Sequence, residues 1–590
     1  MYHITLDGQG YLIDLDRYVR RSFDPFAGKL ASGQRSYGDL RGPEQVLRVS
    51  DWSGGEGYAE HDPANPSRFR EAYGIDGYSE PGALRLGPEV AAAVGNFGVS
   101  ESAALAVFNN QLVIGTTGGS ILRFDGTTLT LIGTVPALGT IRAIEPFMNR
   151  CYLAGDGGGQ ISELSAAWSL TAAKATVAGA AGIQSMQAFY RQAVQFLYLV
   201  AYAGGVNGLP TVVWFDGAGL SPKQYDFEQG FGLATAVLEN RLYWFVSDLN
   251  SRLGVYSIDD SSSGGVYRHH VTQDGLYCWD AAVFDGKVYL ACNPNGQIYS
   301  WDGTKLERVR LAGVLGAAYP YELRCLATWN QALWVAYQDA SGLGLLRFDG
   351  TAWSRPVSGL GGDAPRKLAV YASQLYLSTF RTGLGTLWRT TGTYRSSGYV
   401  ESGLFDAGLP GLTKVARSAT VFHAALAAGQ GVQLQYRFEA TGAWTTLGTS
   451  STVGATTATF AFSGATSWKS VAWRVVLAGP GGASTPVVRE VLIRYAVQPS
   501  VAREWEFPII LEGTAELPLV RLDGSAEPQS GVQLAAALWA SKAQTGPLTF
   551  IDLDASSRTV WFEELQEEIA QLSQRKGYQT VGKVRLVEAA

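Results

Sequence analysis

Apolar runs of four to six residues recur through the middle of the chain at a nearly constant spacing, and most of them follow a polar turn. The aligned positions of these runs are Leu112, Cys151, Leu197, Leu242, Val288, Leu333 and Leu375. The steps between them are 39, 46, 45, 46, 45 and 42 residues. Repeats of this length are typical of the blades of a β-propeller. The spacing therefore predicts a seven-bladed β-propeller over residues 99–398.

Each repeat also contains apolar runs before and after the aligned one. In the first repeat, residues 105–108 and 111–115 are followed by residues 120–124. The pattern predicts a small antiparallel sheet in every repeat. Its first two strands are almost wholly apolar, as expected where neighbouring blades cover both faces of a sheet.

An Asp-Gly pair ends the third run of several repeats. It tolerates the positive φ angles that a tight hairpin needs. An Asp in this position is far more often a turn former than a catalyst, and we interpret all of these residues in that way. They are Asp125, Asp216, Asp302 and Asp349.

The pattern changes on both sides of the repeats. Residues 1–98 are rich in Gly, Pro, Asp, Arg and Tyr and carry little apolar surface of their own, so we expect an extended N-terminal arm that lies on the propeller or on another subunit. Residues 399–498 contain regular short strands with polar alternation, separated by turn clusters such as 479–482. This arrangement predicts a β-sandwich, with strands at residues 414–423, 432–438, 457–462, 470–477 and 487–495.

Residues 499–590 carry helical signals among short strands and are predicted to form a small α+β assembly domain. One helix is expected at 533–543 and a second at 563–574, where four Glu side chains lie in the first turns and Arg575-Lys576 at the end. This charge order suits the helix dipole. A hairpin at 548–562 and a strand at 583–588 complete the predicted unit.

Length and composition agree with a β-rich chain of several domains. The 590 residues exceed what one core holds. Glycine is frequent and only 17% of residues are charged. A net charge of −6 disfavours nucleic-acid binding. No apolar run approaches the ~20 residues of a membrane span, and no secretory signal is evident, so we expect no membrane insertion and assembly in a cytoplasm.

Catalytic, metal-binding and cofactor-binding residues are not predicted. All cysteines fall in predicted strands, which favours buried thiols over disulfides or metal ligands. His269 and His270 are neighbours in a predicted strand and point to opposite faces, so a zinc site is not expected. The sequence also lacks the phosphate-binding loop and the facing carboxylate pair of common hydrolases. We therefore expect a protein that is not an enzyme. The cysteines are Cys151, Cys278, Cys292 and Cys325.

Aromatic residues near the blade rims leave a binding role open. Trp214, Trp301 and Trp388 end predicted strands and could stack on sugars. The alternative is packing between blades, which we favour. The predicted sandwich could be either a spacer without a ligand or a sugar-binding module, and we favour the spacer.

Several motifs resemble the structural proteins of tailed-bacteriophage virions. The start of the chain does so through Tyr-Gly-Asp-Leu at 37–40, Asp-Trp-Ser-Gly-Gly-Glu-Gly at 51–57 and residues 82–88, which lead into the propeller. Residues 431–438 and 485–489 are similar to sandwich modules of phage tail proteins and of carbohydrate-active enzymes. Residues 538–539, 547–552 and 584–588 resemble small domains that form rings in phage tails.

This resemblance implies a structural virion protein at the tail tip, the baseplate or another peripheral tail position. It implies symmetric homo-oligomers in a ring, contacts with other tail proteins, and possible contacts with a host cell-surface glycan or protein. Trp52, Trp539 and Glu588 are the expected assembly residues. The alternatives are a propeller-based carbohydrate-active enzyme, which needs converging carboxylates or arginines on one propeller face, and a glycan-binding adhesin, which needs export.

Overall fold

The structure is a computed structural model. It describes residues 2–23, 45–97, 101–203, 210–222, 225–227, 232–247, 253–260, 265–269, 277–293, 297–309, 325–339, 342–361, 364–381, 384–410, 413–438, 442–462, 467–497, 502–511, 519–544, 546–573 and 577–588. The motif at 37–40 and the pair Arg575-Lys576 lie outside these residues.

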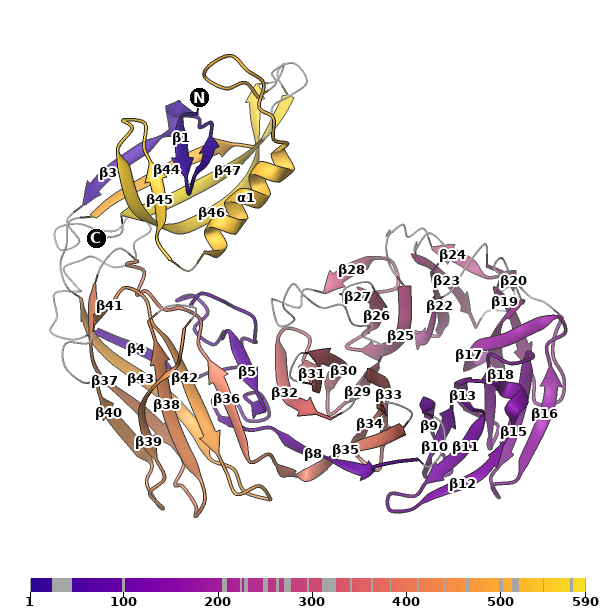
Figure 1. Ribbon diagram of the computed structural model, residues 1–590. Helices are drawn as coiled ribbons and strands as arrows, with labels where there is room; N and C mark the ends of the chain where they lie inside the picture. Colours follow the sequence, from indigo (N-terminus) through magenta and orange to yellow (C-terminus); the bar gives the residue numbers. More distant parts are fainter. Residues whose placement is uncertain are drawn as a thin grey trace.

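Antiparallel β-sheets make up nearly all of the described chain, as predicted (Figure 1). They form three regions, which we call the seven-sheet region, the sandwich and the C-terminal sheet. One α-helix, α1 (Gly531–Ala543), and the short 3-10 turns η1 (Leu15–Arg17) and η3 (Pro136–Leu138) are the helical elements among the described residues.

The seven-sheet region consists of consecutive four-stranded sheets. The first is β9 (Ser102–Phe108), β10 (Gln111–Thr116), β11 (Ser120–Phe124) and β12 (Leu129–Thr134). The second is β13 (Ile141–Phe147), β14 (Arg150–Gly155), β15 (Gln160–Ser165) and β16 (Leu170–Thr176). The third is β17 (Ala180–Arg191), β18 (Val194–Ala203), β19 (Pro210–Phe215) and β20 (Tyr225–Asp226).

The later sheets follow the same plan. The fourth is β21 (Gly232–Leu238), β22 (Arg241–Ser247), β23 (Leu253–Asp259) and β24 (Tyr267–His269). The fifth is β25 (Tyr277–Phe284), β26 (Lys287–Asn293), β27 (Gln297–Trp301) and β28 (Leu306–Val309). The sixth is β29 (Leu326–Trp329), β30 (Ala332–Asp339), β31 (Gly342–Phe348) and β32 (Trp353–Leu360). The seventh is β33 (Ala364–Tyr371), β34 (Gln374–Arg381), β35 (Leu384–Tyr394) and β8 (Pro88–Val94).

Neighbouring sheets meet through their first strands. β9 contacts β13, and the series continues through β17, β21, β25, β29 and β33, while β33 also contacts β9. Each first strand therefore has two first-strand neighbours. The apolar runs that recur in the sequence form the second strands, and their aligned residues are buried between sheets, as predicted.

The Asp-Gly turns are confirmed as turn formers. In the first sheet, the Asp125 carboxylate accepts hydrogen bonds from the backbone N–H groups of Thr127, at 2.9 Å, and Thr128, at 2.7 Å. The three other turns repeat this pattern. These bonds hold the pKa of each Asp below its ordinary value where burial is slight, as at Asp302.

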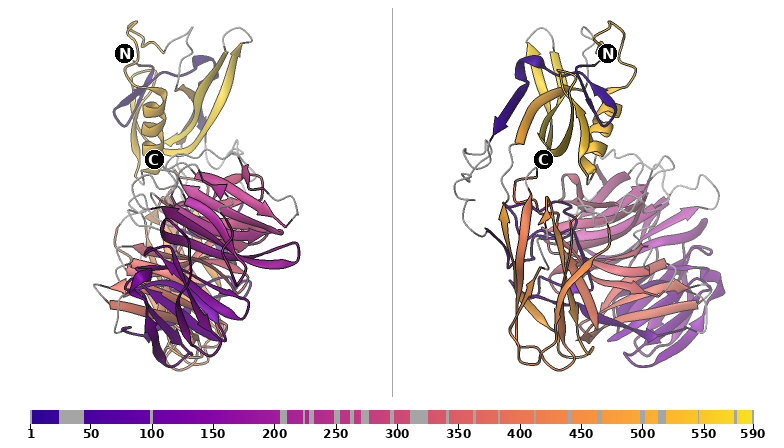
Figure 2. Two further views of the ribbon diagram at one scale, coloured as in Figure 1. Left: turned by 90° about the vertical axis from the view of Figure 1, so that its right-hand side faces the viewer. Right: turned by 60° about the vertical axis from the view of Figure 1, so that its left-hand side comes forward.

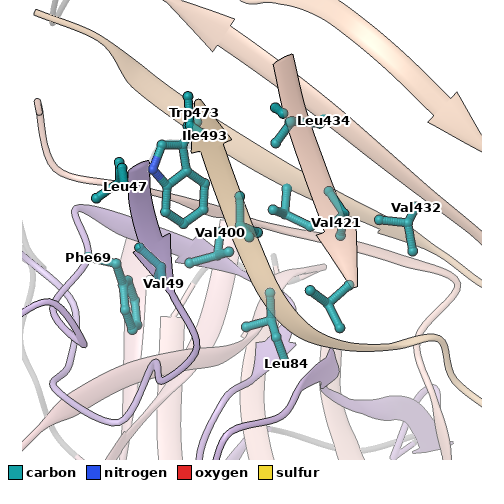
Figure 3. Close-up of a cluster of buried hydrophobic side chains, with 14 of the residues drawn as sticks. Leu47, Val49, Phe69, Leu84, Val400, Val421, Val432, Leu434, Trp473 and Ile493 are labelled. Carbon is teal, nitrogen blue, oxygen red and sulfur yellow. The ribbon is translucent and has the colours of Figure 1, made fainter. Parts of the chain in front are cut away.

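The sandwich packs two sheets face to face, and its five predicted main strands are confirmed. One sheet is β39 (Thr445–Ser450), β38 (Gly431–Arg437), β42 (Ala472–Ala478), β36 (Ser397–Glu401) and β5 (Glu71–Tyr73). The other has β40 (Thr457–Ala461), β37 (Lys414–His423), β43 (Val487–Val497), β7 (Leu84–Leu86) and β6 (Ile75–Asp76), with β4 (Gln45–Val49) on β43 and β41 (Ser467–Trp468) on β37. Figure 3 shows their shared core, in which Leu47, Phe69 and Leu84 of the N-terminal segment pack with Val400 and Trp473.

The C-terminal sheet runs in the order β2 (Gln9–Tyr11), β1 (Ile4–Leu6), β45 (Leu548–Ile551), β46 (Ser557–Ser573), β47 (Gly577–Glu588), β44 (Ala502–Ile510) and β3 (Val19–Phe23). The helix predicted at 533–543 is confirmed as α1, which inserts Leu534 and Leu538 into the core of this region. The prediction of a helix at 563–574 is wrong, because residues 563–573 belong to β46. Backbone pairing with β47 along the strand overrides the helical preference of its charged residues.

Residues before 98 do not form one extended arm. They supply β1, β2 and β3 to the C-terminal sheet, β4 to β7 to the sandwich, and β8 to the seventh sheet (Figures 1 and 2). The expectation of a single arm is thereby corrected. Short apolar runs that cannot fold alone instead pair with sheet edges whose backbone groups need partners.

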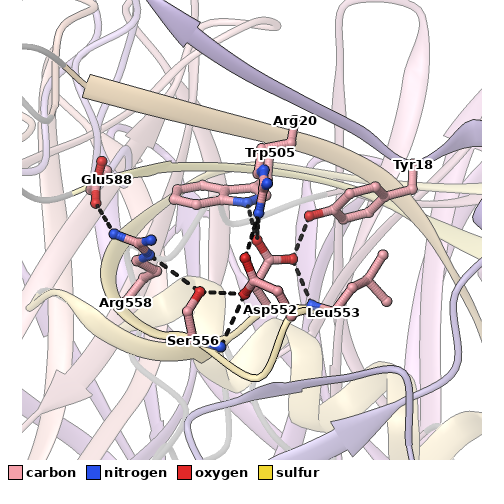
Figure 4. Close-up of polar contacts among 9 residues, drawn as sticks. Tyr18, Arg20, Trp505, Asp552, Leu553, Ser556, Arg558 and Glu588 are labelled. Atoms are coloured by element: carbon pink, nitrogen blue, oxygen red, sulfur yellow. Dashed lines mark hydrogen bonds and ion pairs between the residues drawn. The ribbon is translucent and has the colours of Figure 1, made fainter.

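The N-terminal segment is also held by polar contacts. Tyr18 and Arg20 reach from the end of η1 and from β3 to the buried Asp552, to which the Trp505 indole donates at 2.9 Å (Figure 4). The Arg20 guanidinium lies 3.1 Å from that carboxylate. A buried carboxylate is costly unless it is paired, so this network fixes the N-terminal strands to the C-terminal sheet.

Candidate functional site

A cavity of about 630 Å³ lies where first strands of the seven-sheet region come together. We call it the first-strand cavity. Its walls come from the first, second, third, fifth and seventh sheets. The lining residues are Glu101, Ser102, Ala103, Thr117, Thr140, Arg142, Asp156, Gln184, Tyr202, Trp279, Arg366 and Lys367.

Ion pairs hold the charged side chains of this cavity. Arg142 Nη2 lies 3.1 Å from Asp156 Oδ2, and Arg366 Nη2 lies 2.8 Å from Glu101 Oε2. Lys367 Nζ lies 2.6 Å from Asp280 Oδ1, just beyond the lining. Each cation of the described lining therefore has a carboxylate partner.

Lys367 is charged at neutral pH despite its surroundings. Burial lowers its pKa, but the Asp280 carboxylate outweighs burial and leaves the pKa above the ordinary value for lysine. Asp280 Oδ2 also accepts the backbone N–H of Leu326 at 2.9 Å. A single carboxylate thus connects the fifth, sixth and seventh sheets.

Two aromatic rings border the cavity. Trp279 is 37% exposed on the first strand β25. Tyr202 is half-buried, and its hydroxyl lies 3.5 Å from the carbonyl oxygen of Asp156. The cavity therefore presents an accessible aromatic surface next to charged and amide groups.

A second, wider cavity of about 1110 Å³ lies between residues 51–82 and the sixth and seventh sheets. Arg347 stacks on Tyr78 inside it, with 3.7 Å between the guanidinium carbon and the ring centre. Next to it, the buried Glu56 pairs with Arg355 of β32. These contacts fasten the N-terminal segment to the seven-sheet region, so this cavity is a seam between parts of the chain.

Two tryptophans that the sequence analysis considered for contacts with a partner molecule are too buried to make them. Trp52 is 3% exposed and belongs to the sandwich core, so its prediction as an assembly residue is wrong. Trp301 is 0% exposed and packs between the fourth and fifth sheets, so it cannot contact a glycan. In both cases a large apolar surface is used for packing between sheets.

Trp214 and Trp388 are half-buried and lie outside the lining of the first-strand cavity. Trp214 packs against Phe196, with 4.6 Å between ring centres. The Trp388 indole donates to the Thr379 hydroxyl at 3.1 Å. Their side chains serve the packing of the third and seventh sheets.

The remaining assembly residues lie on the C-terminal sheet. Trp539 is 49% exposed on α1. Glu588 ends β47 and lies 3.3 Å from Arg558 (Figure 4). Because β47 pairs with both β46 and β44, it offers no open edge to another chain. The edge strands of this sheet are β2 and β3.

The four cysteines are buried free thiols, as predicted. Cys278 and Cys292 face each other across β25 and β26, with their sulfurs 3.0 Å apart. Burial raises the pKa of Cys292 well above its ordinary value, and the hydrogen bond with Cys278 adds to this. Both side chains act as small apolar groups in the core between the fourth and fifth sheets.

In the part of the chain that the structure describes, no helix is long and apolar enough to span a membrane. Within the same residues, His, Cys, Asp and Glu form no group of three or more that could hold a metal ion.

No protein-family model and no curated protein matches the chain. Among solved structures, the computationally designed Ika8 protein matches with a TM-score of 0.33 and 12% identity, over 50% of this chain and 99% of its own. The extracellular domain of a hybrid two-component system of B. thetaiotaomicron matches with a TM-score of 0.36 and 12% identity, over 51% of this chain and 39% of its own. Both TM-scores lie below 0.5, so neither likeness supports a statement about fold or function.

The sequence interpretation missed the residues of the first-strand cavity, although a signal for them exists. Five lining residues each stand five positions before an aromatic residue at or near the end of a first strand, namely Phe108, Phe147, Phe189, Phe284 and Tyr371. Superimposing the repeats would have singled out this position.

Proposed function

We propose that the seven four-stranded sheets form one closed seven-bladed β-propeller. The contact of β33 with β9 supports closure, because it joins the seventh sheet to the first. The pairing of β8 with β35 supports it further, since the outer strand of the last sheet comes from chain that precedes the first sheet. Closure of this kind removes open sheet edges.

We propose that the protein is a non-enzymatic structural component of a tailed-phage virion, at the tail tip, the baseplate or another peripheral tail position. The observation that carries this is the sharing of N-terminal strands among all three regions (Figure 2). Domains joined by a linker move relative to one another unless their interface is large. Strands that belong to another region's sheet brace the regions against such motion, which suits a part of a large particle.

Ion pairs between the regions add to this bracing. Glu56 of the N-terminal segment is fully buried beside Arg355 of the sixth sheet. Burial raises the Glu56 pKa to about 7, opposed by the nearby arginine. Lys542 of α1 lies 3.1 Å from Glu60, whose neighbours pair with the sandwich. The N-terminal segment thus contacts all three regions through side chains as well as strands.

The proposed assembly surface is α1 with the edge strands of the C-terminal sheet. On α1, Val532 is 81% exposed and Trp539 is 49% exposed. Exposed apolar side chains of this size mark contact surfaces when they cluster. Edge strands such as β3, which pairs with β44 on one side, can add a neighbouring chain's strand on the other. Repetition of one such contact around an axis gives a ring of identical subunits.

Mass spectrometry of purified phage particles tests the virion assignment. We expect peptides of this chain in the tail fraction at a fixed copy number. Absence of the chain from particles that are made in its presence would contradict the proposal.

A double variant tests the assembly surface. Val532→Ser with Trp539→Ala should leave the melting temperature unchanged within a few degrees but reduce incorporation into particles. Val453→Ser is the matched control, because Val453 is equally apolar and 66% exposed on the sandwich. Normal incorporation of the double variant would show that attachment lies on another surface.

A further inference from the structure

Five first strands carry a β-bulge close to their beginning. In β9, Ser102 pairs with Thr116 while Ala104 pairs with Gly115, so Ala103 is an extra residue without a partner across the strand pair. The same irregularity occurs in β13, β17, β25 and β33. The extra residues there are Arg142, Gln184, Trp279 and Arg366, and β17 has a second one, Ala181, which does not line the first-strand cavity.

One extra residue from each of the five strands lines the first-strand cavity, namely Ala103, Arg142, Gln184, Trp279 and Arg366. A bulge leaves its extra residue outside the ladder and re-aims its side chain, and bulges are frequent beside binding sites. The same backbone device in five sheets therefore directs five side chains at one space.

The bulge position differs chemically from its surroundings. The strands around it repeat one apolar pattern that ends in an aromatic residue, whereas the bulge residues are one Ala, two Arg, one Gln and one Trp. The bulge residue differs in chemical type from sheet to sheet, while the strand around it stays similar. Such variation indicates a role in binding rather than in packing.

The charge of the site selects the ligand. Arg142 and Arg366 are paired with Asp156 and Glu101, and Lys367 is paired with Asp280. The described lining therefore has no uncompensated charge. An anionic ligand would find no uncompensated positive charge here and would lie close to the carboxylates of Glu101 and Asp156, so its own desolvation would not be repaid. An uncharged ligand avoids this cost.

We propose that the first-strand cavity binds an uncharged saccharide. One apolar ring face of the sugar stacks on the Trp279 indole, whose flat surface suits a ligand with one apolar side and polar edges. The hydroxyl groups bond to Arg142, Gln184 and Arg366, because a guanidinium has five N–H donors and a carboxamide both donates and accepts. A cavity of about 630 Å³ lies in the range of small-molecule sites.

This inference rests on the proposed virion role only for its biological setting. Sugar binding is measured on purified protein and incorporation on particles, so either proposal can fail while the other holds. The proposed sugar site therefore differs from the rim tryptophans considered in the sequence analysis. Trp301 is buried, and Trp214 and Trp388 lie outside the cavity lining.

Ligand-observed NMR and calorimetry on the full-length chain test the proposal. The probes are cellobiose, lactose and N,N′-diacetylchitobiose, with N-acetylneuraminic acid as the anionic comparison. We expect saturation transfer to at least one neutral disaccharide and weaker or no transfer to the acid. Failure of all three neutral probes at millimolar concentration, or tighter binding of the acid, would overturn the assignment of an uncharged saccharide.

Variants locate the binding. Trp279→Ala should weaken the neutral probe at least about tenfold, as for a central aromatic contact, and Gln184→Ala on another sheet should weaken it less. Tyr190→Ala is the matched control, because Tyr190 is an aromatic residue 58% exposed on the first strand β17 but outside the cavity lining, and it should leave binding unchanged. Near-ultraviolet circular dichroism checks the fold of each variant. If Trp279→Ala does not fold, Gln184→Ala decides alone, and unchanged affinity in the folded variants would overturn the site.

Discussion

Lys367 Nζ of β33 donates a hydrogen bond of 2.6 Å to Asp280 Oδ1 of β25. The two strands belong to the seventh and fifth sheets, and the sixth sheet lies between them in the sequence. The second carboxylate oxygen of Asp280 accepts the backbone N–H of Leu326, at the start of β29 in that intervening sheet. Three sheets therefore meet at one carboxylate beside the first-strand cavity. The pair acts as a side-chain link between first strands.

Asp280→Asn should destabilise the seven-sheet region by about 2 kcal/mol. Removing one member of a buried pair leaves the other charge uncompensated, and the partial exposure of Lys367 reduces the cost below that of a fully buried pair. Differential scanning calorimetry measures the change. Glu307→Gln, which removes the exposed pair with Lys305, is the control and should leave the transition in place. An equal, small effect of both variants would contradict a structural role for Asp280.

Glu145 should make stability depend on pH. Its Oε1 accepts from Gln187 Nε2 at 3.1 Å and from the backbone N–H of Ala188 at 3.0 Å. Burial raises its pKa from 4.5 to about 7, opposed by the bond from Ala188. The folded state therefore binds this proton more tightly than the unfolded state. The resulting stabilisation is complete below about pH 4.5 and is lost as the pH rises through 7.

Glu145→Gln removes this dependence while it keeps an oxygen acceptor. We expect the variant and the natural chain to melt alike at pH 4.5, and the variant to be more stable by about 1–2 kcal/mol at pH 8. Melting curves across this range measure the difference. A constant offset between the two proteins at every pH would show that Glu145 does not titrate as described.

Asp302 should be replaceable by Asn but not by Ala. Its carboxylate accepts from the backbone N–H groups of Thr304 at 2.9 Å and Lys305 at 2.7 Å. Asn offers the same oxygen in the same turn, so Asp302→Asn should change stability by less than about 0.5 kcal/mol. Asp302→Ala leaves both donors without this partner and should cost about 1 kcal/mol. Thermal unfolding distinguishes the two, and equal costs would contradict the turn assignment.

The sequence predicts the elements whose pattern is local. The second strands were recognisable because each is a continuous apolar run between turn residues. The start of α1 also carries a local signal, because its N-cap Ser530 and Gln533 in its first turn form a capping box. The predicted helix in β46 failed because pairing with β47, a contact between distant backbone groups, outweighs local preference. A single sequence shows a strand's residues but not which sheet edge receives them.

The candidate site depends on information of the same distant kind. Arg142, Trp279 and Arg366 lie far apart in the sequence. They line one cavity only because the fold brings the first strands of different sheets together. Each also lies at a bulge, a departure from alternation that the sequence does not announce. The rim tryptophans drew attention because of their residue type, although strand ends between packed sheets are buried, as at Trp301.

The fold predicts a specific requirement for β8. The sequence predicts the propeller over residues 99–398, but β8 forms the outer strand of the seventh sheet and Val90 is buried in the adjoining core. Phe97 is buried as well, and its backbone N–H donates to Gly385 at 3.1 Å. A fragment that starts after Phe97 lacks β8, so it exposes one edge of β35 and loses the buried side chains of Val90 and Phe97.

We expect a fragment of residues 86–398 to be more stable than one of residues 101–398 by about 3–5 kcal/mol, since burial of a Val and a Phe contributes about that much. Phe97→Ala in the longer fragment should fall between them. A synthetic peptide of residues 86–97, added in excess, should raise the melting temperature of the shorter fragment, because it restores the missing strand and stabilises the form that binds it. Equal melting temperatures of the two fragments, with no response to the peptide, would show that the seventh sheet closes without β8 and that the N-terminal segment only lies on its surface.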